Sequence, residues 1–505
     1  MAAVFKALML AAALTALGAG GSLAADDTKA GATASADKKG DKPDLPPFPA
    51  DASVRQTTRV GGRSLNYLAT VGSLPVRDDK GKTIAQVVFT AYTLPGSRDP
   101  ARPVTFAFNG GPGAASVYLN LGAIGPKRVP FGAAGDSLSD PARPIDNDGT
   151  WLDFTDLVFI DPVGTGFSRS LVSKDETKKA FYATKPDIEY LSRIVYDWLL
   201  KNGRMTSPKY VAGESYGGFR GPRITHYLQT QLGVGVKGLV LVSPYLDSAA
   251  EFDPSLSPLP WVITLPSMAA ANLERQHRLT PEAMTAVEDY ARGDYAADLM
   301  KGRTDPAAAE RIERRVVELT GLDPGFVKQS GGRIETQAFL REIFRGEGAL
   351  GSRYDSNVTA YDPFPYAPEQ RTGDPILGAI IAPTTSAMTD FVTRVVGWKV
   401  EARYNALSSE VGKLWNDGHE EQVESVTALR EAVAIDPKLR VLIVHGWNDL
   451  SCPFFASVLV VDQMPAMGDP TRVAVKEYPG GHMFYSRQAS RLALRRDVMA
   501  LYGAR

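Results

Sequence analysis

The chain has 505 residues, of which 44% are hydrophobic and 22% are charged, and these ordinary fractions exclude a wholly disordered protein, a collagen and a coiled coil. Its 56 lysines and arginines nearly balance its 57 acidic residues, so no electrostatic argument supports binding to nucleic acid or to an anionic membrane. A single cysteine, Cys452, excludes an intramolecular disulfide and a multi-cysteine metal site, and the five histidines form no HExxH pair. We therefore expect a protein that uses neither a metal nor another cofactor.

The first 50 residues have the composition of a processing segment followed by a linker. Lys6 precedes an apolar run over residues 7–17 and then small residues, an order typical of a signal peptide over residues 1–25. A frayed amphipathic start is the alternative. Residues 26–50 lack apolar periodicity, which predicts a flexible linker. Because no later stretch looks long and apolar enough to span a bilayer, we expect a periplasmic or secreted protein without a membrane span.

Short apolar runs alternate with helical patterns near both ends of the remaining chain. In the segment 187–201, for example, apolar residues recur on one side of a predicted helix. Continuous apolar strands that alternate with helices are typical of an α/β fold, with a mainly parallel central sheet covered on both faces. The expected strands are 87–94, 104–108, 157–160, 210–212, 239–242, 441–444 and 473–475.

The middle of the chain breaks this alternation. Residues 249–435 contain proline-rich stretches and charged helical segments such as 306–319, with few signals of buried strands. We interpret them as a largely helical cap inserted between two halves of one core, residues 51–248 and 436–505. A separate domain is the alternative, but the second half alone is too small to form an independent α/β domain.

The strongest local motif is the G-x-S-x-G pentapeptide Gly213-Glu-Ser-Tyr-Gly217. It follows a predicted strand and precedes a helical pattern at 218–232. In that context the two glycines permit a tight strand-to-helix turn that exposes the hydroxyl of Ser215 at a helix N-terminus. An accidental glycine-rich turn is the alternative. We interpret Ser215 as a nucleophile.

A serine nucleophile requires a base, and the base requires an acid to orient it. In α/β hydrolases both follow the nucleophile along the chain, on loops after late strands. Asp449 follows the strand 441–444, and His482 follows the strand 473–475 on a glycine-rich loop. His445 is the rival base, but its place at a strand end favours a packing role. We therefore select Asp449 and His482.

Glycines after the strand 104–108 predict an oxyanion hole. The run Asn109-Gly-Gly-Pro-Gly113 lets the backbone approach a reacting carbonyl group, so that an N–H of this run can donate to it. The second donor is expected to be the N–H after the nucleophile, at Tyr216. A simple tight turn would also account for these glycines.

Together these residues resemble the serine carboxypeptidase family, peptidase family S10, over roughly residues 60–245 and 436–500. The resemblance implies an α/β-hydrolase fold with a helical cap, a Ser215–Asp449–His482 triad, the Gly111 and Tyr216 oxyanion hole, and no metal. Four ordered motifs carry it: Asn109-Gly-Gly-Pro-Gly113, Asp161-Pro-Val-Gly-Thr-Gly-Phe-Ser168, Gly213-Glu-Ser-Tyr-Gly-Gly218, and the pair Gly446-x-x-Asp449-x-x-Cys452-Pro and Gly481-His-Met483.

The same resemblance implies how a substrate's terminal carboxylate is bound. Family members use an asparagine and two protonated carboxylic side chains, and Asn109 and Glu214 occupy two of these places. The third place holds Ala123 in this chain, and Ala107 and Ala114 stand where the family usually has Trp and Cys. Cys452 and Met483 are expected near the substrate. We therefore expect weaker discrimination between free-acid peptides and their amides or esters than in the family, unless the cap supplies an arginine or another acid.

The sequence as a whole predicts an exported serine-type carboxypeptidase that acts on peptides through an acyl-enzyme. An esterase or acyltransferase on the same scaffold is the alternative within enzymes. A catalytically inactive binding protein that retains the fold is the alternative from another class, and the intact set of Ser215, Asp449 and His482 argues against it.

Overall fold

The computed structural model describes residues 45–95, 99–130, 143–248, 256–416 and 423–503. The predicted signal peptide, residues 1–25, and most of the predicted linker lie outside the described residues. The end of that linker runs without helix or strand, and Phe48 packs against the chain. Its ring lies 5.1 Å from the ring of Trp398, and the guanidinium of Arg169 lies 3.7 Å above it.

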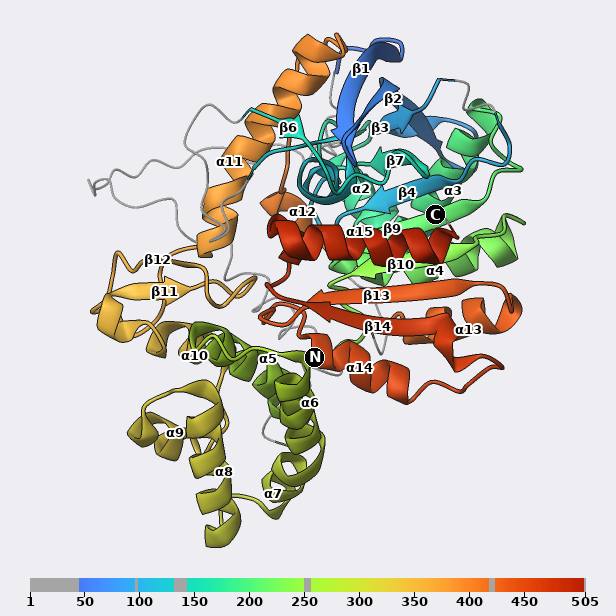
Figure 1. The fold of residues 1–505 in the computed structure, drawn as a ribbon. Coiled ribbons are helices and arrows are strands. Elements are labelled where there is room, and N and C mark those ends of the chain that lie inside the picture. The colour runs from blue at the N-terminus through green and yellow to red at the C-terminus, as the bar shows by residue number, and fades with distance from the viewer. Residues whose placement is uncertain (1–44, 96–98, 131–142, 249–255, 417–422, 504–505) are drawn as a thin grey trace, which may run out of the picture.

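A mixed, mainly parallel sheet forms the centre of the molecule (Figure 1). Its antiparallel part consists of β1, β2 and β3, and six parallel strands follow from β7 to β14. The predicted α/β class is therefore confirmed. In spatial order the strands are β1 (Ala52–Val60), β2 (Arg63–Arg77), β3 (Thr83–Thr93), β7 (Asp156–Ile160), β4 (Val104–Phe108), β9 (Lys209–Glu214), β10 (Gly238–Val242), β13 (Arg440–Gly446) and β14 (Val473–Tyr478). The short β8 (Arg169–Ser170) pairs with β3.

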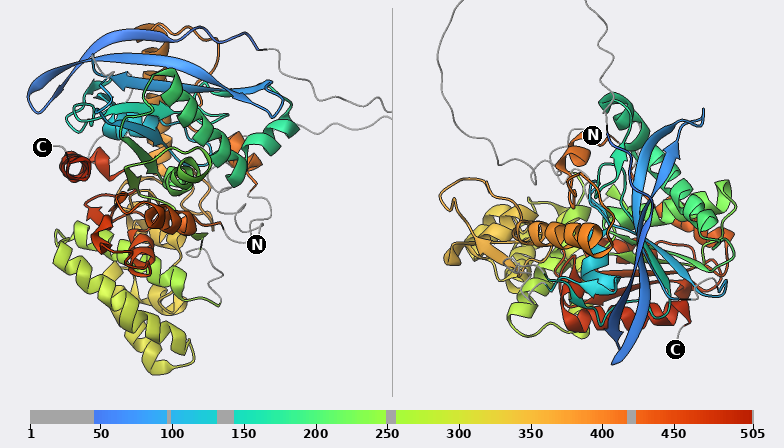
Figure 2. Two further views of the ribbon diagram at one scale, coloured as in Figure 1. Left: turned by 90° about the vertical axis from the view of Figure 1, so that its right-hand side faces the viewer. Right: turned by 90° about the horizontal axis from the view of Figure 1, so that it is seen from above.

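The parallel strands are buried on both faces because helices cover both sides of the sheet. Alternate side chains of β4 point in opposite directions, so that Phe106 and Phe108 join one hydrophobic cluster and Ala107 joins the other. One face is covered by α15 (Gln488–Tyr502), as Figures 1 and 2 show. The other face is covered by α2 (Lys174–Phe181), α3 (Thr184–Lys201), α4 (Tyr216–Gln231) and α13 (Val426–Ile435).

The segment between β10 and β13 is largely helical, and its first helices lie below the sheet in Figure 1. Several of its helices begin with a capping side chain followed by proline, as at Asp305 and Asp323, where the carboxylate accepts an N–H three residues later. The last helix of this predicted insertion, α13, packs with the core. The others are α5 (Leu259–Arg275), α6 (Pro281–Tyr290), α7 (Ala296–Lys301), α8 (Pro306–Thr320), α9 (Pro324–Ser330), α10 (Thr336–Glu342), α11 (Pro375–Asp390) and α12 (Ser409–Leu414).

Shorter elements complete the described chain. Two small hairpins pair β5 (Lys127–Arg128) with β6 (Ile145–Asp146), and β11 (Ala349–Gly351) with β12 (Thr359–Tyr361). One further helix, α14 (Phe454–Asp462), lies between β13 and β14 in sequence and packs on the cap through Phe454 and Phe455. The single-turn helices are η1 (Leu119–Ile124), η3 (Ala291–Tyr295), η4 (Arg345–Glu347), η5 (Phe391–Val395), η6 (Pro470–Arg472) and η7 (Phe484–Ser486).

One helical stretch of the cap corrects the expectation that no later segment is long and apolar enough to span a bilayer. Residues Pro375–Val395, which form α11 and η5, are long and apolar enough by length and composition to cross a bilayer. Ile376, Ile380 and Phe391 of this stretch pack in the same hydrophobic cluster as the sheet. A helix that packs in the core of a soluble protein has the same composition, so this stretch is weak evidence for a membrane span.

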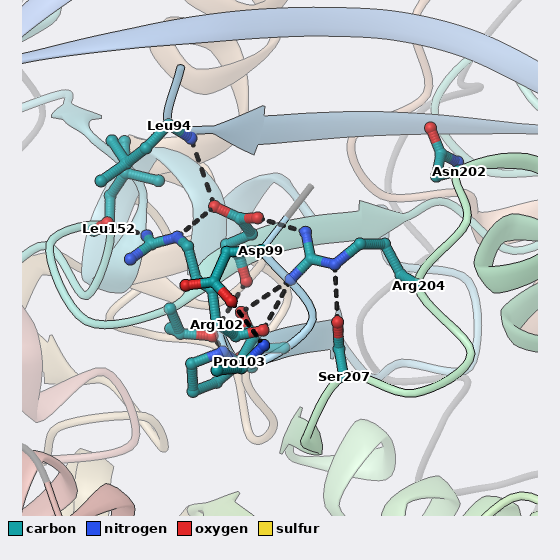
Figure 3. A network of polar contacts seen from close by, with 12 residues as sticks. Leu94, Asp99, Arg102, Pro103, Leu152, Asn202, Arg204 and Ser207 are labelled. Atoms are coloured by element: carbon teal, nitrogen blue, oxygen red, sulfur yellow. Dashed lines mark hydrogen bonds and ion pairs between the residues drawn. The ribbon is translucent and has the colours of Figure 1, made fainter. Parts of the chain in front are cut away.

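A buried ion-pair network joins the N-terminal ends of three parallel strands (Figure 3). Asp156 lies at the start of β7. Its Oδ1 is 2.7 Å from Nε of Arg102, and its Oδ2 is 2.5 Å from Nη1 of Arg204. Arg204 also donates to the carbonyl of Arg102 at 2.7 Å and to Oγ of Ser207 at 2.7 Å. Because parallel strands present their carboxyl ends at the opposite edge, this network fixes the sheet on the side away from the predicted site.

Candidate active site

Ser215 lies on a sharp turn between β9 and α4. Its φ of 60° and ψ of −122° belong to a strained backbone region, and its N–H donates to the carbonyl of Val242 at 3.0 Å. A Cβ on Gly213 would lie 2.0 Å from the carbonyl oxygen of Gly217, and a Cβ on Gly217 would lie 2.2 Å from that of Phe108. Both positions therefore require glycine, which is the geometry of a nucleophile elbow.

Asp449 and His482 come together on the loops that follow β13 and β14. Nδ1 of His482 lies 2.7 Å from Oδ2 of Asp449, and both side chains are buried. The other carboxylate oxygen of Asp449 accepts the N–H groups of Ser451 at 2.7 Å and Cys452 at 2.9 Å. Asp449 is thus fixed by its own loop and holds the imidazole by one ring nitrogen, which leaves the other for a proton transfer.

The electrostatics of His482 follow from this pairing. Burial lowers the pKa of His482, but the charge of Asp449 and its hydrogen bond outweigh burial and raise that pKa well above its ordinary value. The ring of Tyr354 packs edge-on against the imidazole, with 5.2 Å between ring centroids. The carbonyl of His482 accepts the hydroxyl of Ser243 at 2.8 Å, and its N–H donates to the carbonyl of Tyr354. His482, the predicted base, is therefore fixed by Asp449, by the ring of Tyr354 and by both of its own backbone groups.

The predicted oxyanion donors lie beside the elbow. Gly111 and Tyr216 line the same cavity as Ser215 and His482. The neighbouring Gly110 approaches so closely that a Cβ there would lie 2.5 Å from the backbone nitrogen of Tyr216. The loop after β4 and the start of α4 are therefore adjacent, as two backbone donors to one oxygen must be.

Asn109 and Glu214 are in direct contact. Nδ2 of Asn109 donates to Oε2 of Glu214, and Oδ1 of Asn109 accepts the N–H of Leu119 at 2.9 Å. The second carboxylate oxygen of Glu214 accepts the hydroxyl of Tyr485 at 2.7 Å. Burial raises the pKa of Glu214, against the lowering effects of His482 and of these two hydrogen bonds. Ala123 is buried, 1% exposed, and does not line the cavity.

The cavity over Ser215 has a volume of about 140 Å³. Cys452 and Met483, which the sequence places near a substrate, both line this cavity. Five further lining residues come from the predicted cap and were not predicted: Arg353, Tyr354, Leu377, Ile380 and Leu407. Nothing in the local sequence marks these five, because they reach the cavity only through the tertiary packing of the insertion.

Three further described histidines, His226, His277 and His445, do not line this cavity. His445 is fully buried in β13, where its Nε2 lies 2.8 Å from Oγ of Ser457. Burial and the charge of His482 lower the pKa of His445 to about 3, so it is neutral. His226 faces Glu431 at 3.3 Å and His277 is exposed. His419 lies outside the described residues.

An ion pair beneath the site supports the oxyanion loop. Arg220 of α4 is buried, and its Nε lies 2.6 Å from Oδ2 of Asp187 on α3. Its Nη1 donates to the carbonyl of Asn109 at 2.9 Å. The charge of Asp187 and its hydrogen bond raise the pKa of Arg220 in spite of its burial. Arg220 therefore orients the loop after β4, a role that no motif in the sequence marks.

A second charged cluster joins the cap to the two loops that carry Asp449 and His482. Arg487, five residues after His482, pairs with Glu274 of α5 and lies 2.8 Å from Asp355. Nδ2 of Asn448, the neighbour of Asp449, donates to the same two carboxylates at 2.5 and 3.3 Å. The cap and the catalytic loops are thus linked by groups that are mostly buried. In the part of the chain that the structure describes, no group of three or more His, Cys, Asp or Glu side chains is arranged to hold a metal ion.

The chain is similar to known serine carboxypeptidases. The family model for serine carboxypeptidases matches residues 76–292. The pheromone-processing carboxypeptidase KEX1 of Yarrowia lipolytica is 31% identical over 153 residues, 30% of this chain and 23% of that protein. The serine carboxypeptidase-like protein 50 of Arabidopsis thaliana is 30% identical over 186 residues, 36% of this chain and 39% of that protein. The matches therefore span less than half the length of either relative.

Structural similarity extends further along the chain. The crystal structure of KEX1(delta)p, a prohormone-processing carboxypeptidase from Saccharomyces cerevisiae, matches with a TM-score of 0.53 and 17% identity. The match covers 86% of this chain and 91% of that one. The predicted α/β-hydrolase fold is therefore confirmed.

Proposed function

The chain belongs to the serine carboxypeptidase family, and from this and the geometry of its cavity we propose that it is an exported serine-type carboxypeptidase. The observation that carries the proposal is the 2.7 Å contact between Asp449 and His482, whose side chain lines the same cavity as Ser215 on its strained turn. Export is proposed on the sequence of residues 1–25 alone, and a peptide is proposed as the substrate from the family.

In the proposed reaction, Ser215 Oγ attacks the carbonyl carbon of the last peptide bond while Nε2 of His482 takes its proton. Asp449 orients the imidazole and stabilises the imidazolium, and the N–H groups of Gly111 and Tyr216 stabilise the oxyanion. The C–N bond then breaks, and His482 returns the proton to the leaving amine. Water hydrolyses the acyl-enzyme by the same steps, with His482 as base and Ser215 as leaving group.

The test combines labelling with product analysis. A fluorophosphonate probe should label Ser215 in the folded protein, and Ser215→Ala should abolish both labelling and peptide hydrolysis. Mass spectrometry of a blocked peptide should then reveal residues lost one at a time from the C-terminus. Labelling with ester hydrolysis but no loss of C-terminal residues would indicate the esterase or acyltransferase instead. No adduct on folded protein would favour the inactive binding protein.

A further inference from the structure

Arg353 lines the cavity, and one nitrogen of its guanidinium has no hydrogen-bond acceptor in the described part of the protein. It lies between β11 and β12 of the cap and lines the cavity with Ser215 and His482. Its Nε is buried and has no hydrogen-bond partner among the described residues. A buried guanidinium nitrogen without an acceptor costs free energy, so an anionic ligand would offset that cost.

Three carboxylates at or beside this cavity are already engaged by other groups. Asp374 accepts the backbone N–H of Arg353 at 2.9 Å, and it caps the N-terminus of α11 while also binding the hydroxyl of Ser352. Glu214 is bonded to Asn109 and Tyr485, and Asp449 is paired with His482. No other arginine lines this cavity in the described part of the chain.

The position of Arg353 indicates which part of a substrate it faces. Its neighbour Tyr354 packs on the imidazole of His482, and the carbonyl of Arg353 accepts the N–H of Leu450 on the acid's loop. Arg353 is therefore attached to the His482 side of the cavity. His482 gives its proton to the leaving amine, so the leaving residue lies on that side, and in a carboxypeptidase this residue carries the free carboxylate.

We propose that Arg353 binds the C-terminal carboxylate of the substrate, in the role left open by Ala123. This inference rests on the proposed function and adds the residue that recognises the substrate's anion. An arginine presents two parallel N–H donors that match a carboxylate and stays charged at every physiological pH. A carboxylic side chain, in contrast, binds the anion only while protonated. Arg353 therefore extends recognition of the free acid to neutral pH.

Binding to the Ser215→Ala protein tests this inference without requiring turnover. Calorimetry at pH 5 and pH 8 would compare N-blocked dipeptides that end in leucine free acid, leucine amide or leucine methyl ester. A dipeptide that ends in glutamate amide provides a side-chain carboxylate alone. At pH 8, we expect Arg353→Met to weaken free-acid binding by about 10- to 150-fold, the loss of one charge-assisted pair. Binding of the leucine amide and ester should stay within about twofold on the same scale.

Matched variants separate this role from a structural one. Arg353→Lys keeps the positive charge but lacks the two parallel N–H donors of the guanidinium, so it should recover part of the affinity for the free acid. Arg278→Met removes an exposed arginine elsewhere on the cap and should change nothing. Equal losses of affinity for the acid, the amide and the ester would overturn the inference. A loss of affinity confined to the glutamate amide would also overturn it, because Arg353 would then bind a substrate side chain and not the terminal carboxylate. A wild-type protein that binds the free-acid dipeptides as expected but hydrolyses no peptide would refute the proposed function and leave this inference standing.

Discussion

The hydroxyl of Tyr485 donates to Oε1 of Glu214 at 2.7 Å, and Glu214 directly precedes the predicted nucleophile in the chain. This hydrogen bond favours the ionised carboxylate and so lowers the pKa of Glu214, while burial raises it. Because η7 brings Tyr485 to the site from the chain segment after His482, the protonation of Glu214 depends on a residue 271 positions away.

Tyr485→Phe should move the acid-dependent part of substrate recognition to higher pH. Without the hydroxyl the pKa of Glu214 rises, so its protonated form, which can donate to a substrate carboxylate, persists further toward neutrality. The measurement is the ratio of kcat/KM for a blocked dipeptide acid to that for its amide, from pH 4 to 8. A shift to lower pH would contradict the role given to this hydrogen bond.

His482→Ala should lower kcat by about 10⁴ or more while the protein still folds, because both proton transfers depend on its imidazole. The matched change His445→Ala should leave most of the activity, since His445 is buried, neutral and bonded to Ser457. Steady-state kinetics with circular dichroism as the control for folding would check both. Loss of activity in the His445 variant alone would reverse the assignment.

A bulky adduct on Cys452 should block the site, because this thiol lines the cavity three residues after Asp449. The expected result is loss of peptide hydrolysis after stoichiometric reaction with a mercurial. Cys452→Ala should keep its activity and become resistant to the reagent. Full activity of a wild type whose modification is confirmed by mass would show that the thiol does not face the substrate.

Asp161 should make stability depend on pH. It is buried against the oxyanion loop, where it accepts the N–H of Ser116 at 2.8 Å, and burial raises its pKa from 3.8 to about 7. Between about pH 4 and pH 7 the folded state therefore holds a proton that the unfolded state releases, so stability falls as pH rises through this range. Asp161→Asn should reduce the loss of unfolding free energy between pH 5 and pH 8, measured by urea denaturation. An equal loss in both proteins would contradict this.

Asp156→Ala should destabilise the protein by about 3–5 kcal/mol, because it leaves two buried guanidinium groups without their carboxylate. The network lies at the edge of the sheet away from the cavity, so the kcat of the folded fraction should not change. Lys174→Ala, which breaks the exposed pair with Glu410, is the control and should leave the urea midpoint nearly unaltered. A comparable effect of both variants would mean that the network is not the cause.

The parts of the fold that the sequence predicted are those with a local signal. Parallel strands such as β10 are buried on both faces, so they appear as continuous apolar runs. The hairpin β1–β2 was missed because residues 55–59 of β1 are all polar, so β1 shows neither a continuous apolar run nor a sustained alternation. Asp449 and His482 could be selected because each follows a predicted strand, and the structure brings them into contact.

Arg353, Tyr485 and Arg487 could not be found in the same way. Each acts on a partner that is distant in sequence, and none belongs to a motif. Their roles depend on how the cap and the last loops pack, which is decided by the whole set of buried contacts and not by a local pattern.

The pairing of β10 with β13 has a consequence for how activity arises during folding. Gly238 aligns with Arg440, so the pairing of these neighbouring strands closes a loop that contains the whole segment between them. Pairings across such long separations form slowly, because the entropy of closing the loop is lost before the contacts stabilise it. In the proposed mechanism, Ser215 lacks its base until β13 and β14 dock. The proposed hydrolytic activity would therefore arise late in folding, and chains that have not finished folding would be unable to digest one another.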